Sequence, residues 1–187
     1  MSPRPHLLGI DDGPFEKRSA DQVPLVAVMM EGAQLVEAVA IRTFPVDGED
    51  ATGCLAQWAA GFRFRPAVQG LILGGITIGG LGVIDTPALA DALGVPVLVV
   101  TRHLPDNREL AAALRASGLA HRQPILDRTP KSYRLRQGLF LAHAGGHRRD
   151  AEHLVEAALG KANLPEPLRV AHLIGRALVM GESRGRV

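Results

Sequence analysis

The sequence has little from which to build a disulfide framework, a zinc site or a membrane span. A single cysteine, Cys54, stands among 187 residues, which excludes an internal disulfide and a cysteine-rich zinc centre. No apolar run is long enough for a transmembrane helix, and no signal-peptide core is evident. Aromatic residues make up only 4% of the chain, so Leu, Val, Ile and Ala must build the core. We expect a soluble, cytoplasmic protein with no membrane partner.

What the chain does contain is ordinary for a globular protein. A length of 187 residues supports a full core, and we interpret residues 1–187 as a single domain. Hydrophobic residues account for 47% and charged residues for 21%, which are ordinary shares for such a protein. A formal charge of +2 and an isoelectric point near 9.1 permit a nucleic-acid partner without requiring one.

Apolar runs and helix-start signals predict an order of strands and helices. The expected strands are 7–12, 23–30, 34–44, 68–73, 95–100 and 139–142. The expected helices are 51–63, 86–93, 105–117, 148–159 and 166–180. A short connection at 31–33 favours antiparallel pairing of the second and third strands. We predict an α/β fold, a ribonuclease-H-like mixed sheet of three antiparallel strands and then βαβ crossovers, with helices on both faces and C-terminal helices.

The first strand ends in two carboxylates, Asp11 and Asp12. Burying a carboxylate is costly unless a cation or hydrogen-bond donors meet it. Successive side chains of a strand point to opposite faces, so at most one of the pair faces a given site directly. Capping of the Gly13-Pro14 turn would explain one of these residues equally well, but not both.

Further carboxylates on loops at strand ends are candidates to complete a cation site with this pair. Mg²⁺ or Mn²⁺ is the expected ion, because hard cations prefer oxygen ligands from several segments. Asp50 and Asp85 are the candidates, although each also precedes a predicted helix and suits an N-cap. Asp47 lies beside Gly48, and a turn explains it as well.

A glycine-dense loop at residues 74–82 follows the fourth strand. It matches neither a Walker A motif nor a dinucleotide fingerprint, but its glycines let a backbone or a base approach closely. A loop that merely requires positive φ angles is an equally good explanation. We assign base or nucleic-acid binding to Gly74, Gly75, Thr77, Gly79 and Gly80.

Histidines and arginines supply the remaining candidates. His147 opens a helix and could ligate a metal or donate a proton, whereas His172 lies on the apolar face of the last helix and is expected in the core. Arg102 ends the central strand on the side of the predicted site. Residues 119–136 are basic and aperiodic, and we interpret them as a loop or extended arm. This arm could follow a phosphate backbone, or simply be solvated. Its basic residues are Arg122, Arg128, Lys131, Arg134 and Arg136.

Two end motifs of the chain resemble the endonuclease dU family, which is similar to endonuclease V. The motifs are residues 9–15 and residues 164–174, with a Gly-Ile-Thr loop between them. The acidic residue of the first strand of endonuclease V falls on Asp11, and its Gly-His-Arg motif matches residues 146–148. Arg102 stands where that family has lysine. The Leu-Pro-Glu-Pro-x-Arg segment matches residues 164–169.

The resemblance implies a Mg²⁺- or Mn²⁺-dependent endonuclease of DNA repair that cuts a phosphodiester near a deaminated base, uracil or hypoxanthine, in DNA or RNA. It assigns catalysis to Asp11, Arg102 and His147, and we expect Asp11, Asp12, Asp50 and Asp85 to hold the metal.

Two departures from the family pattern leave other functions open. Gly74 falls where endonuclease V has an aspartate, and the glutamate of its first helix has no counterpart near Cys54. The alternative is therefore a nucleic-acid-binding or regulatory module of the same fold that has lost the chemistry. A small-molecule phosphohydrolase is a third option.

Overall fold

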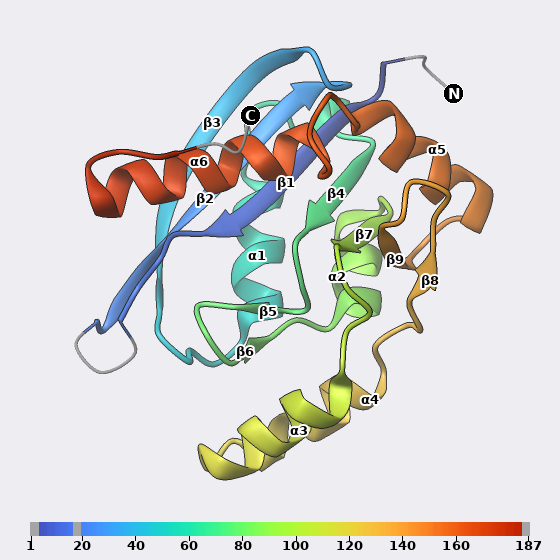
Figure 1. Cartoon of the computed structure of the whole chain (residues 1–187). Helices are drawn as coiled ribbons and strands as arrows, with labels where there is room; N and C mark the ends of the chain where they lie inside the picture. Colours follow the sequence, from blue (N-terminus) through green and yellow to red (C-terminus); the bar gives the residue numbers. More distant parts are fainter. Residues whose placement is uncertain (1–3, 17–19, 185–187) are drawn as a thin grey trace.

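The computed structural model describes residues 4–16 and 20–184. A seven-stranded mixed sheet lies at its centre, with the spatial order β3-β2-β1-β4-β7-β9-β8 (Figure 1). Its strands are β1 (His6–Asp12), β2 (Gln22–Glu31), β3 (Leu35–Pro45), β4 (Gly70–Leu73), β7 (Val97–Thr101), β8 (Tyr133–Arg134) and β9 (Phe140–Ala144). As predicted, β1, β2 and β3 pair antiparallel, and two crossovers then add β4 and β7 parallel to β1.

Helices cover both faces of this sheet (Figure 1). One face packs on α1 (Ala51–Ala60) and α2 (Thr86–Leu93), the other on α5 (Arg148–Ala158) and α6 (Glu166–Met180). Side chains of β1 alternate between the two cores, because Leu8 and Ile10 join the first and Leu7 joins the second. Within residues 4–16 and 20–184, no helix has both the length and the apolar composition needed to cross a membrane.

Helix α6 lies in direct backbone contact with β1. A Cβ atom on Gly9 would lie only 2.4 Å from the carbonyl carbon of Pro167, so a larger residue there would push the helix away. About two turns further along α6, a Cβ atom on Gly175 would lie 3.1 Å from the Cα atom of Gly13. These close approaches place the middle of α6 directly over the end of β1.

A smaller part of the chain projects beyond the lower end of the sheet (Figure 1). It combines α3 (Asn107–Ala116), a 3₁₀ turn (Ala120–Arg122), α4 (Gln123–Asp127) and the hairpin of β5 (Thr77–Ile78) and β6 (Gly82–Val83). A separate apolar cluster holds these elements together. Its buried members are Leu81, Val83, Ala111, Leu114 and Leu126.

The interpretation of residues 119–136 as a loop or extended arm is wrong, because α4, the 3₁₀ turn and β8 fold there. Arg122 is only 3% exposed, and its guanidinium donates to the carbonyl oxygens of Leu81 and Asp47 at 2.6 and 2.8 Å. It also donates to Glu49 Oε1 at 2.7 Å. Arg122 therefore ties the β5–β6 hairpin to the chain after β3 and is not available to a phosphate.

Candidate active site

The carboxyl ends of β1, β4 and β7 meet at one edge of the sheet, because the three strands are parallel neighbours. They bring Asp11, Gly74 and Arg102 to this edge. A hollow of about 180 Å³ is lined by Asp11, Asp12 and the chain after β4. A second hollow, of about 420 Å³, is lined by Asp11, Gly74, Arg102 and a residue of α6, His172.

Asp11 faces α6 and pairs with His172. The Oδ2 atom of Asp11 lies 2.9 Å from His172 Nδ1. This hydrogen bond raises the pKa of His172, and partial burial opposes the shift. The prediction that His172 is a core histidine is wrong, since its side chain is 54% exposed. The glycine contacts between α6 and β1 bring this edge of the helix over the end of the strand, and helical periodicity alone does not reveal that.

Asp12 points to the opposite side of the strand and is met by a backbone donor. Its Oδ2 atom accepts a hydrogen bond of 2.7 Å from the N–H of Gly79. Burial raises the pKa of Asp12, the Gly79 bond opposes that shift, and the nearby charge of Asp11 reinforces it. Asp12 is thus anchored to the loop after β4 while still lining the smaller hollow with Asp11.

The glycine-dense loop forms the β5–β6 hairpin, which hydrogen bonds to Asp12 and Asp47 hold in place. Its candidate residues fall into two groups. Gly79 and Gly80 adopt φ angles of +59° and +96°, and the adjacent Leu81 N–H donates to Asp47 Oδ1 at 2.7 Å. The positive-φ explanation therefore accounts for Gly79 and Gly80. Gly74, Gly75 and Thr77 instead line the hollow beside the acidic pair.

Asp50 and Asp85 have structural partners. Asp50 Oδ1 accepts from the N–H of Gly53 at 2.9 Å and caps α1. Asp85 Oδ1 accepts from the N–H of Ala88 at 3.1 Å and caps α2, and its Oδ2 lies 2.6 Å from Arg128 Nη2. In the described part of the chain, no group of three or more His, Cys, Asp or Glu residues is arranged to hold a metal ion. Contrary to expectation, Asp50 and Asp85 do not join Asp11 and Asp12 in one cation site, because each of the two caps a helix.

His147 lies at the other end of the sheet from Asp11. Strand β9 is antiparallel to β7, so Phe140 pairs with Thr101 and the strand leaves beside Val97. A Cβ atom on Gly146 would accordingly lie 3.3 Å from Pro96 Cγ, at the beginning of β7. Arg102 follows the opposite end of that strand. The expectation that His147 joins Asp11 is therefore wrong, because the sequence does not show in which direction the last strand runs.

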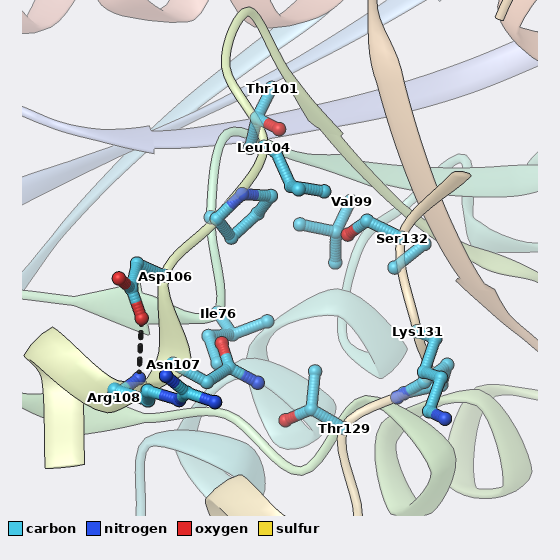
Figure 2. A pocket seen from close by; sticks show the side chains of 14 residues that line it. Ile76, Val99, Thr101, Leu104, Asp106, Asn107, Arg108, Thr129, Lys131 and Ser132 are labelled. Atoms are coloured by element: carbon cyan, nitrogen blue, oxygen red, sulfur yellow. Dashed lines mark hydrogen bonds between the residues drawn. The ribbon is translucent and has the colours of Figure 1, made fainter. Parts of the chain in front are cut away.

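A further hollow of about 420 Å³ adjoins the acidic end (Figure 2). Its walls include Ile76, Val99 and Leu104, and polar side chains from α3 and from the segment after α4 surround them. It shares Gly75 with the smaller hollow, and Thr101 and Leu104 with the hollow beneath α6. Four separate segments supply its lining, which is why the sequence indicated little of it beyond Gly75 and Lys131. The polar residues are Asp106, Asn107, Arg108, Thr129, Lys131 and Ser132.

The donor atoms at the strand ends fit one hard cation that takes most of its ligands from outside the chain. Asp11 and Asp12 supply carboxylate oxygens at the end of β1, but the neighbouring strand β4 is followed only by Gly74. A Cβ atom there would lie 3.8 Å from Asp11 Oδ1. Mg²⁺ is commonly held by one or two carboxylates together with waters and substrate phosphates. The residues fit that arrangement and do not fit a closed cage of protein ligands.

The sequence model of the endonuclease dU family matches residues 3–179 of this chain. The chain belongs to the endonuclease dU family. A UPF0215 protein from Methanothermobacter thermautotrophicus is 37% identical over 183 residues, which span 96% of this chain and 90% of that protein. The resemblance seen in the two end motifs is thereby confirmed, and family membership supports a nuclease.

Solved structures share the fold of this endonuclease dU chain. A protein of unknown function from Archaeoglobus fulgidus has a TM-score of 0.84 at 31% identity, covering 94% of this chain and 98% of that chain. Endonuclease V from Ciona intestinalis, solved with a 24mer DNA containing an inosine followed by a ribo-adenosine, has a TM-score of 0.61 at 10% identity. That match covers 95% of this chain and 87% of that chain. The ribonuclease-H-like mixed sheet is confirmed.

Proposed function

We propose that this endonuclease dU chain is a divalent-cation-dependent endonuclease that cuts a phosphodiester near a deaminated base, uracil or hypoxanthine, in DNA. The observation that carries the proposal is the Asp11–His172 pair, which lies in a hollow where three parallel strands end. Family membership supports the nuclease class. The Ciona endonuclease V complex, with its inosine-containing DNA, supports the choice of a deaminated base.

The acidic pair would hold Mg²⁺ or Mn²⁺ at the end of β1, with Asp11 nearer α6 and Asp12 fixed by Gly79. When bound, the cation would activate a water molecule and neutralise charge that develops on the phosphate. His172, half-exposed beside Asp11, would hold or move a proton at the attacking water or at the phosphate oxygen. Arg102 lines the same hollow and would stabilise the additional negative charge of the transition state.

The hollow in Figure 2 would receive the extruded base. Reading a damaged base requires taking it out of the stack and placing it in a pocket beside the bond that is cut. Apolar side chains such as Ile76 and Val99 suit the faces of a base, and polar groups such as Asn107 and Ser132 suit its edge. Gly75 belongs to both this pocket and the acidic hollow, so base and phosphate would bind side by side.

Cleavage of uracil- and inosine-containing oligonucleotides tests the proposal. The wild-type chain is expected to cut in Mg²⁺ or Mn²⁺ and to be inactive with a chelator. Asp11→Ala is expected to lower the cleavage rate by at least about 10³-fold, because it removes the carboxylate shared by both hollows. Asp50→Asn is the matched control, since asparagine caps α1 as well as aspartate does. Cleavage that survives Asp11→Ala would overturn the proposal.

The absence of a carboxylate at Gly74 favours a second candidate, a nucleic-acid-binding or regulatory module without chemistry. This candidate predicts retention on deaminated oligonucleotides with a steep dependence on salt concentration. It predicts no strand break with any divalent ion. The same oligonucleotides therefore decide between the two candidates when binding and cleavage are both measured.

A further inference from the structure

A second surface continues from the candidate site along α6. A hollow of about 640 Å³ lies between one side of this helix and the segment that joins it to α5. It shares Arg102, Leu164 and His172 with the hollow at Asp11, so the two form one continuous surface. We call the hollow of about 640 Å³ the α6 groove.

The α6 groove is strongly basic. None of its lining residues, within the described part of the chain, is acidic. This is a local property, because the whole chain carries 21 Lys and Arg against 19 Asp and Glu. The basic lining residues are Arg102, Lys161, Arg169, Arg176 and Arg184.

Not all of these charges are free. Arg169 pairs with Glu166 at 2.6 Å, and Arg184 pairs with Glu182 at 3.1 Å. Among the residues that the structure describes, Arg102, Lys161 and Arg176 have no carboxylate partner. Like charges gathered without counter-ions destabilise a folded protein slightly, and such a cluster is typical of a surface that binds an anion.

The geometry of α6 orders these charges around the candidate site. Arg169 lies one turn before His172 and Arg176 lies one turn after it, so the three share one side of the helix. At 1.5 Å per residue they span about 10 Å of helix. A polyanion lying along this side would therefore pass the Asp11–His172 pair and contact cations both before and after it.

We propose that the α6 groove binds the phosphate backbone of the nucleic-acid strand on either side of the bond that is cut. Among the described residues, Lys161 and Arg176 are its unpaired cations apart from Arg102, which the proposed function assigns to the transition state. The assignment rests on the proposed function for its position relative to the cut, but the binding itself is measurable without cleavage. Guanidinium and ammonium groups bind phosphate oxygens without reading sequence. The pocket of Figure 2 would thus bind the base, and the α6 groove would bind the backbone.

The test measures the affinity of the full chain for a uracil-containing oligonucleotide, single-stranded and duplex, in EDTA over a range of salt concentrations. The double variant Lys161→Ala/Arg176→Ala is expected to bind more weakly. Its slope of log affinity against log salt should fall by about 1.4 for a single strand and about 1.8 for a duplex, since each lost phosphate contact contributes about 0.7 or 0.9.

The matched control is Arg115→Ala/Arg149→Ala, which removes the same charge from exposed positions on α3 and α5. It should keep the wild-type slope. An unchanged slope in the groove variant, or an equal loss in the control, would overturn the proposal. Competition by polyglutamate as effective as that by an oligonucleotide of equal charge would overturn it in favour of an acidic polypeptide.

Parallel cleavage assays in Mg²⁺ separate this proposal from the proposed function. If the groove variant shows the change in slope but the wild-type chain cuts no substrate, the groove proposal stands and the nuclease proposal is overturned. If the wild-type chain cuts its substrate but the groove variant keeps the wild-type slope, only the groove proposal is overturned. If both hold, the groove variant should show a raised KM and a nearly unchanged kcat, because it loses binding and not chemistry.

Discussion

Two regions flank the end of β1, and they differ in how firmly their polar side chains are tied. On the hairpin side, Asp12 accepts from the backbone of Gly79, Asp47 accepts from Leu81, and Arg122 donates to two carbonyl groups. On the α6 side, Asp11 contacts the side chain of His172, which is half-exposed. Side chains tied to the backbone hold the architecture, whereas a pair between two accessible side chains can exchange its partners for a substrate.

The largest expected effect is on cleavage, and it comes from removing the Asp11–His172 pair on the α6 side. His172→Ala is expected to lower the cleavage rate by about 10²- to 10⁴-fold, the usual contribution of a positioned proton-transfer group. The free energy of unfolding should change by less than about 1 kcal/mol, because the pair is partly exposed to water. Single-turnover cleavage and urea unfolding measure the two quantities on the same variant.

His147→Ala is the control for this experiment. His147 is exposed, makes no side-chain cap to α5 and lies at the other end of the sheet. Neither cleavage nor stability should change. A loss of cleavage in His147→Ala with none in His172→Ala would reverse the assignment of the two histidines.

These histidines show what the sequence could and could not supply. Apolar runs predicted the six longer strands, the crossovers and the acidic end of β1, because burial in a sheet leaves a local pattern. They did not predict the two-residue strands β5, β6 and β8, which are too short to leave one. The capping alternatives for Asp50 and Asp85 were also available from local signals, and the structure shows both caps. The place of His172 depends on contacts between residues far apart in the sequence, and no local pattern records them.

The next effect comes from breaking the hairpin side. Arg122→Met is expected to lower the free energy of unfolding by about 3 kcal/mol, because it leaves the buried carbonyl group of Leu81 and the partly buried carbonyl group of Asp47 without a donor. Urea unfolding measures this. Arg115→Ala, at an exposed position on α3, should cost less than about 0.5 kcal/mol. Equal stabilities of the two variants would show that the hairpin is not held by Arg122.

A smaller loss is expected where the two regions are joined. Gly9→Ala places a Cβ atom 2.4 Å from the backbone of Pro167, so α6 must shift away from β1. Overpacking of this kind costs about 2 kcal/mol. Cleavage should slow as well, because the shift separates His172 from Asp11. Gly61→Ala is the control, since a Cβ atom there meets nothing closer than 3.5 Å and φ is −77°. Full activity in Gly9→Ala would show that contact between α6 and β1 does not position His172.

The smallest expected effect is a gain in cation affinity, and its measurement tests whether the α6 side holds a cation. Gly74→Asp adds a carboxylate at the end of β4, where a Cβ atom meets Leu168 at 3.5 Å in ordinary contact. Cation sites gain affinity with the number of charged ligands, so Mn²⁺ binding measured by calorimetry should tighten about tenfold. Gly74→Asn has nearly the same shape without the charge and should leave the affinity unchanged. Equal affinity of the aspartate and asparagine variants would place the cation away from Asp11, because a new charge beside an occupied site must change its occupancy.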